Sequence, residues 1–243
     1  MPINMFAPPP QLPHPDIHLS ELLIIEEGLR TAWSLLRTTS PLGFDLANAD
    51  EDEITEQFIQ IILDQVLEHD LVRGFGKSLF LVHRESKFRN FNGEKLDKMP
   101  DLAVSIIGRK DVGFRSNDEL FIECKPVGPK HTVGQKYCDD GIIRFVEGGY
   151  AWTMRQAMMI GYVSTGYTII PKLSDALKDP KRITSPKIIE TLDFPYACLN
   201  AKSKADLWCE AVYITRHKRN FKYIQNEEPA PPITLRHLWL RRD

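Results

Sequence analysis

The chain has 243 residues, of which 42% are hydrophobic and 26% charged, and its formal net charge is −2 at pH 7. This balance is typical of a globular protein with a sizeable core, and it excludes a chain that is basic over its whole surface. The apolar runs are far shorter than the ~20 residues that cross a bilayer, and no secretory signal is visible. Together with four cysteines that form no CxxC pair, this predicts a cytoplasmic protein without a membrane association.

The first 18 residues form a proline-rich segment. Its six prolines are Pro2, Pro8, Pro9, Pro10, Pro13 and Pro15. Proline stiffens a chain and removes backbone donors, so we expect residues 1–18 to be an extended or disordered tail. Behind it, Ser20 is placed to cap a helix, and apolar residues recur at helical spacing up to Leu36. We expect residues 19–243 to form a single domain.

Charge is distributed in blocks along the next part of the chain. Residues 38–72 hold nine acidic residues and neither Lys nor Arg, whereas residues 73–98 are basic on balance. Within the acidic block, Ile54, Phe58 and Val66 recur at helical spacing and predict a second helix, with Asp50 or Asp52 near its start.

Apolar runs predict the elements that follow. Strands are expected at 79–82, 102–107 and 120–124, the last stopping at Pro126, and they would form an antiparallel meander. A long helix or a pair of helices is expected over 138–163. Further strands are expected at 167–170 and 212–215, and a strand or short helix at 233–240. This order predicts an α/β (α+β) fold with a central sheet flanked by helices.

Three polar residues lie at the ends of two of these strands. Asp101 precedes one strand, and Glu123 and Lys125 end another. Residues two apart on a strand share a face, so Glu123 and Lys125 point together while Cys124 points into the packing. Antiparallel pairing of the two strands would bring Asp101 beside them. Two carboxylates and a lysine suit Mg²⁺, with Mn²⁺ as a substitute, and a phosphate as its further ligand.

The spacing resembles a known motif. Pro100-Asp101, then 21 intervening residues, then Glu123-Cys124-Lys125 is similar to the motif of the PD-(D/E)XK (restriction-endonuclease-like) nuclease superfamily. The resemblance implies a core over about residues 50–163, with a central mixed sheet flanked by helices and with helical N-terminal and basic C-terminal additions. It also implies that Asp101, Glu123 and the main-chain carbonyl of Cys124 hold the metal, and that Lys125 orients a water molecule.

In that superfamily an acidic residue of the preceding helix often joins the metal. The resemblance implies Glu53 here, as a catalytic residue and metal ligand, with Glu56 as the alternative. Read from composition alone, both belong to a solvated helix N-terminus whose charges complement the helix dipole.

Two sets of residues are expected to contact nucleic acid. Arg144, Tyr150 and Gln156 follow the motif, on the expected helix; helix-surface arginines also make ordinary ion pairs. A basic and aromatic segment, residues 202–223, contains the second set, Arg216, His217 and Arg219. Basic side chains bind phosphates and aromatic rings stack on bases, although such a segment is equally well a solvated loop after a buried strand.

The resulting hypothesis is a Mg²⁺-dependent endonuclease that hydrolyses phosphodiester bonds of DNA, in defence against foreign DNA or in a mobile element. The alternative is a catalytically silent module on the same fold that binds nucleic acid or a protein. A third hypothesis is an α+β protein of unknown role in which the strands pair differently and the Asp/Glu/Lys pattern is a coincidence. A homodimer and a protein partner remain open.

Overall fold

A computed structural model describes residues 12–40, 43–84, 90–92, 99–109, 118–184, 186–198 and 211–243. The helices are α1 (Leu19–Thr38), α2 (Glu51–Ile61), the π-helices η1 (Ile62–Leu67) and η3 (Val133–Ile142), α3 (Ile143–Val146), α4 (Ile169–Lys178) and α5 (Lys181–Thr184). The strands are β1 (Phe80–Arg84), β2 (Leu102–Ile106), β3 (Glu119–Val127), β4 (Gln156–Val163), β5 (Thr191–Ala197), β6 (Val212–His217) and β7 (Ile233–Arg241).

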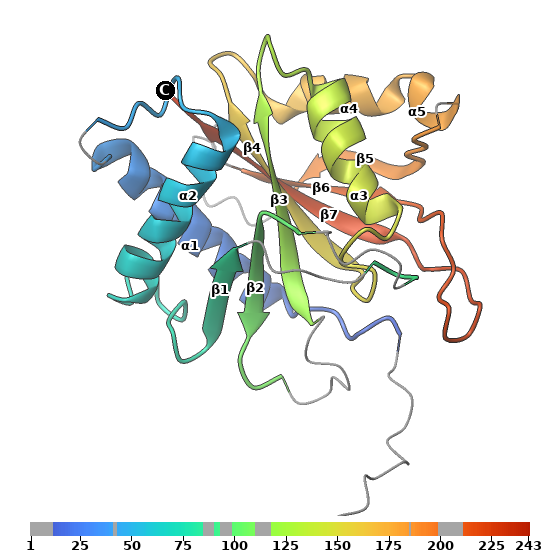
Figure 1. The fold of residues 1–243 in the computed structure, drawn as a ribbon, viewed down its shortest axis with the longest axis horizontal. Coiled ribbons are helices and arrows are strands. Elements are labelled where there is room, and N and C mark those ends of the chain that lie inside the picture. Colours follow the sequence, from blue (N-terminus) through green and yellow to red (C-terminus); the bar gives the residue numbers. More distant parts are fainter. Residues whose placement is uncertain are drawn as a thin grey trace, which may run out of the picture.

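Within the described residues, the seven strands form one mixed sheet in the order β1-β2-β3-β4-β7-β6-β5. The predicted meander β1-β2-β3 is antiparallel, as expected. β4 then pairs in parallel with both β3 and β7, and β6 and β5 complete the sheet with antiparallel pairing. The α/β class predicted from the sequence is therefore confirmed (Figure 1).

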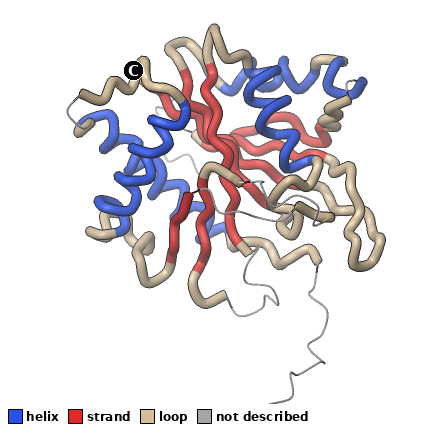
Figure 2. Tube along the Cα trace, in the orientation of Figure 1, coloured by secondary structure: helices blue, strands red, loops and turns tan. Residues whose placement is uncertain are grey.

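Helices cover both faces of this sheet, as Figure 2 shows. On one face, Trp33 of α1 stacks on Tyr162 of β4, with ring centroids 5.4 Å apart. On the other face, Tyr137 of η3 packs edge-on against Trp239 of β7 at 5.6 Å. In the described residues we find no helix with the length and hydrophobicity that a membrane span requires.

Capping sets where the first two helices begin. α1 starts after His18 rather than at Ser20, because the Glu21 side chain accepts a hydrogen bond from the His18 main-chain N–H. α2 starts after Asp50, whose Oδ1 accepts from the Glu53 N–H at 2.9 Å, while Glu53 Oε2 accepts from the Asp50 N–H at 3.1 Å. This reciprocal pair satisfies two backbone donors at the helix start.

The helix predicted over 138–163 is only partly correct. η3 and α3 end at Val146, and residues 156–163 form β4. β4 lies between two parallel neighbours with helices on both faces, and its residues from Ala157 to Val163 are all buried. An apolar run of this kind has no alternation to distinguish a buried strand from a buried helix.

Two further predictions need correction. The strand expected at 167–170 is wrong, because α4 begins there. Ile169, Leu173 and Leu177 are buried at a spacing of four residues, the period of a helix. β3 also continues through Pro126 to Val127. β2 pairs with β3 only as far as Ile122, so no β2 residue lies opposite Pro126. The missing proline N–H therefore breaks no hydrogen bond with β2.

The described part of the proline-rich segment, residues 12–18, has no helix or strand and lies against the sheet end. His14 N–H donates to the Thr153 carbonyl at 2.8 Å, and Arg155 Nη2 lies 2.8 Å from Asp16 Oδ2. Ile17 is 2% exposed. These contacts agree with an extended segment; the prediction for residues 1–11 falls outside the described residues.

Candidate active site

A cavity of about 860 Å³ opens where the N-terminus of α2 meets the end of β3 and the η3–α3 helices. Glu51, Lys125 and Arg144 line it, together with Phe91 from the segment between β1 and β2. The cavity therefore brings together segments that lie far apart in the sequence.

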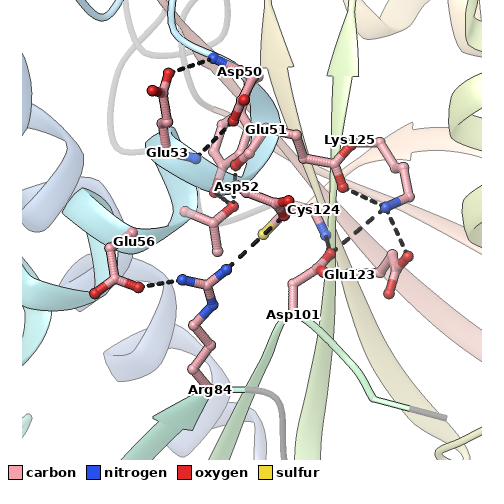
Figure 3. A network of polar contacts seen from close by, with 12 residues as sticks. Asp50, Glu51, Asp52, Glu53, Glu56, Arg84, Asp101, Glu123, Cys124 and Lys125 are labelled. Carbon is pink, nitrogen blue, oxygen red and sulfur yellow. Dashed lines mark hydrogen bonds and ion pairs between the residues drawn. The ribbon is translucent and has the colours of Figure 1, made fainter. Parts of the chain in front are cut away.

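The Lys125 ammonium is at the centre of the polar network (Figure 3). Its Nζ lies 2.6 Å from Glu51 Oε1, 2.9 Å from Glu123 Oε1 and 3.7 Å from Asp101 Oδ2. The three carboxylates come from the start of α2, from β3 and from the residue before β2. The prediction that Asp101, Glu123 and Lys125 converge is confirmed.

Local backbone rules explain this convergence. Leu102 pairs with Ile122, so Asp101 lies beside the next residues of β3, and its Oδ2 accepts from the Cys124 N–H at 2.6 Å. Glu123 and Lys125 project from one face of β3, whereas the Cys124 side chain is fully buried on the other.

Glu123 is the most enclosed of the three carboxylates, with 0% exposure. Arg144 Nη1 lies 2.8 Å from its Oε1, and the Tyr150 hydroxyl donates to its Oε2. Arg144 and Tyr150, expected to contact phosphate, thus both contact this carboxylate. The Arg144 side chain is 36% exposed and borders the cavity, whereas Tyr150 is fully buried.

Burial dominates the acid–base properties of the site. Burial, assisted by the charge of Asp101, raises the pKa of Glu123 to about 7. Burial likewise raises the pKa of Glu51 and of Asp101, against the opposing effect of Lys125. Burial disfavours the Lys125 ammonium, but Glu123, Asp101 and Glu51 outweigh it and raise the pKa of Lys125 above its usual value. Lys125 is therefore protonated at neutral pH.

The acidic residue of α2 that reaches the site is Glu51, which the sequence reasoning missed. Glu53 forms the reciprocal cap with Asp50, and Glu56 pairs with Arg84 of β1. A signal for Glu51 was present: it precedes the buried residues Ile54 and Phe58 by three and seven positions, so it lies on the helix face that packs inward.

Gln156, the third residue expected near the phosphate, lies at the start of β4. Its Oε1 accepts a hydrogen bond from the Ile17 N–H at 2.7 Å, so it fastens the N-terminal segment. It is not among the residues that line the cavity.

The C-terminal set requires correction too. Arg216 is half-exposed and lies 3.7 Å from Asp193, so it remains open to solvent. His217 is fully buried and bonded to Thr215, and Arg219, 4% exposed, donates to main-chain carbonyls. Neither of these two can contact nucleic acid in this structure. Lys202 and Lys204 lie outside the described residues.

In the part of the chain that the structure describes, no group of three or more His, Cys, Asp or Glu side chains is arranged so that it could hold a metal ion. At this site the Lys125 ammonium lies between the carboxylates instead. A comparison with known proteins finds no matching family model, no matching curated protein and no matching solved structure.

Proposed function

We propose that this protein is a divalent-metal-dependent nuclease that hydrolyses phosphodiester bonds of DNA through a PD-(D/E)XK-type site. The observation that carries the proposal is the convergence of Asp101, Glu123 and Glu51 on the Lys125 ammonium beside an open cavity. The order of α2, the β1-β2-β3 meander and the η3–α3 helices supports the proposal, because the resemblance implies a central mixed sheet flanked by helices in this part of the chain.

The chemistry of the donor atoms supports a hard divalent cation, although the Lys125 ammonium lies between the carboxylates in this structure. Three carboxylates face two cations, Lys125 and Arg144, so the fully ionised site carries one net negative charge in a buried place. Burial is the main cause of the raised pKa values of these carboxyls, and a divalent cation would favour their charged forms. Oxygen ligands are the ones that Mg²⁺ and Mn²⁺ prefer.

Asp101 and Glu123 would hold the cation, with Glu51 as the α2 carboxylate. The main chain offers one more oxygen: N–H and C=O of one residue in an extended strand point to the same side, so the Cys124 carbonyl leaves β3 on the side of Asp101. A bound cation would supply Lewis-acid polarisation of a phosphoryl oxygen.

The chain's own residues have complementary roles. Lys125 stays protonated, so it donates hydrogen bonds to the attacking water or to the phosphate rather than acting as a base. Arg144 borders the cavity and keeps guanidinium donors for a phosphate oxygen while it contacts Glu123. Both cations oppose the negative charge that develops during in-line attack.

The silent binding module is the less favoured function. A fold without turnover would gain nothing from burying Glu123 and Lys125, because removing charges from water is costly. Nucleic-acid binding by the C-terminal segment is also less well supported, because His217 and Arg219 are buried and cannot contact a phosphate.

The test is cleavage of supercoiled plasmid, linear duplex and single-stranded DNA with Mg²⁺, Mn²⁺ or EDTA. We expect metal-dependent cleavage that falls roughly 100-fold or more in Asp101→Asn and in Lys125→Met, the scale of losing one transition-state donor. Matched controls are Glu68→Gln and Lys77→Met, which remove charges from an exposed pair elsewhere. Cleavage that survives EDTA, or that persists in Asp101→Asn, would contradict the proposal.

A further inference from the structure

The turn that joins α3 to β4 carries Tyr150, whose hydroxyl donates to Glu123 Oε2. The ring is fully buried and packs edge-on against Phe145, with centroids 5.1 Å apart. Lys125 and Arg144 engage the other oxygen of Glu123. The orientation of this carboxylate therefore depends on where the turn places one hydroxyl group.

A buried arginine from a distant part of the chain holds this turn. Arg219 follows β6, and its guanidinium donates to three main-chain carbonyls, those of Trp152 (2.9 Å), Ala151 (2.8 Å) and Met154 (2.6 Å). These bonds satisfy a charge that would otherwise be costly to bury. They also hold Ala151 at φ 53°, a left-handed conformation that residues with a Cβ rarely adopt.

We propose that Arg219 is a positioning residue for the active site, because it fixes the 150–154 turn and thereby holds the Tyr150 hydroxyl against Glu123. The inference rests on the proposed nuclease function. Ala151 directly follows Tyr150, so a loosened turn moves the hydroxyl first. Catalytic groups must be held to a fraction of an ångström, so such a movement weakens metal binding and turnover without altering the substrate-binding surface.

The first experiment removes only the hydroxyl. Tyr150→Phe is compared with Tyr137→Phe, which removes a hydroxyl from another fully buried ring; Tyr137 contacts His237 and the Met159 carbonyl instead. Mn²⁺ affinity is measured by calorimetry, and kcat and KM by DNA cleavage. We expect Tyr150→Phe to weaken Mn²⁺ binding and lower kcat roughly tenfold or more with KM unchanged, and Tyr137→Phe to leave all three unchanged.

The second experiment loosens the turn. Arg219→Lys keeps the charge but loses the planar guanidinium, and Arg37→Lys is the control, because Arg37 also donates to a main-chain carbonyl, that of Asp243. We expect Arg219→Lys alone to reproduce the Tyr150→Phe effects on kcat and Mn²⁺ affinity. If Arg219 acts through Tyr150, the double variant is no worse than the stronger single variant.

The outcomes separate the inference from the function on which it rests. A wild-type protein that cleaves DNA, with both test variants equal to their controls, overturns the positioning role and leaves the nuclease intact. Fully additive losses in the double variant overturn the link through Tyr150. A wild type that neither binds Mn²⁺ nor cleaves overturns both. If Arg219→Lys does not fold, unchanged Mn²⁺ affinity in Tyr150→Phe still overturns the proposal.

Discussion

Lys125 is the residue around which the site is organised. Its side chain is 7% exposed and contacts carboxylates from three separate elements. Removing one partner of a buried, hydrogen-bonded charge network leaves the others uncompensated, which is costly. The same network keeps Lys125 protonated, so its charge is available to a phosphate.

Glu51, rather than Glu53, is expected to be the functional acidic residue of α2. Glu51→Gln removes a carboxylate 2.6 Å from Lys125 Nζ, and we expect a loss of cleavage of at least about tenfold, the scale of a residue that supports a metal site. Cleavage kinetics at saturating Mg²⁺ measure it.

Glu53→Gln is the matched control. A glutamine keeps the reciprocal hydrogen bond with Asp50, so both stability and cleavage should stay near the wild type. Equal activity of the Glu51→Gln and wild-type proteins, or a larger loss in Glu53→Gln, would show that this assignment is wrong.

At the scale of elements, a chain of buried polar groups joins the two C-terminal strands to η3. Thr215 Oγ1 lies 2.7 Å from both His217 Nε2 and His237 Nε2, and His237 Nδ1 lies 3.0 Å from the Tyr137 hydroxyl. Tyr137 lies on η3, the helix that precedes the Arg144 segment. This network therefore joins β6 and β7 to η3 within the core.

The network makes stability sensitive to acid. Burial lowers the pKa of His217 to about 3, so between that value and the ordinary 6.5 the unfolded chain binds a proton that the folded chain does not. The free energy of unfolding must then fall as the pH falls, by about 1.4 kcal/mol per pH unit for this one group.

His217→Gln removes that contribution. Relative to the wild type, the variant should gain stability steadily as the pH drops from 6.5 towards 4, as measured by urea denaturation at each pH. His69→Gln, an exposed position, serves as the control and should keep the wild-type slope. A constant difference between His217→Gln and the wild type across this range would contradict the buried neutral histidine.

At the scale of the whole molecule, the N-terminal segment joins parts of the chain that are far apart in the sequence. Residues 12–18 contact the turn before β4, the first residue of β4 and, through the Pro15 carbonyl, Arg109. Ile17 is buried against the main core. The segment thus adds apolar burial and polar contacts at the end of the sheet where β4 begins.

Truncation tests this role. Deleting residues 1–18 should lower the free energy of unfolding by about 2 kcal/mol or more beyond the effect of deleting residues 1–11, since burying an isoleucine alone contributes about that much. Denaturant titration of both truncated proteins measures the increment. Equal free energies of unfolding for the two truncated proteins would mean that the contacts of residues 12–18 give no net stabilisation.

Some positions were predictable because local rules decide them. Asp101, Glu123 and Lys125 follow from strand alternation and antiparallel pairing of strands close in sequence. The position of Glu51 could also be predicted from the sequence, because its helical spacing to Ile54 and Phe58 places it on the inner face of α2.

Other positions depend on contacts between distant segments. Arg219 lies 67 residues from Trp152, and nothing in a basic, aromatic-rich segment reveals that its guanidinium is buried under a turn. β4 illustrates the same point for secondary structure: an apolar run becomes a strand because β3 and β7 offer it hydrogen bonds on both sides.

The sequence is enough to predict the helix starts near residues 19 and 51, the antiparallel meander, and the meeting of one aspartate, one glutamate and one lysine at its end, because each depends on a periodicity or a pairing within a short stretch. The folded structure was needed to show which α2 carboxylate reaches Lys125, that Tyr150 and Arg144 contact Glu123, and that His217 and Arg219 are buried. Burial and side-chain partners are set by which distant surfaces pack together, and a one-dimensional pattern does not contain that information.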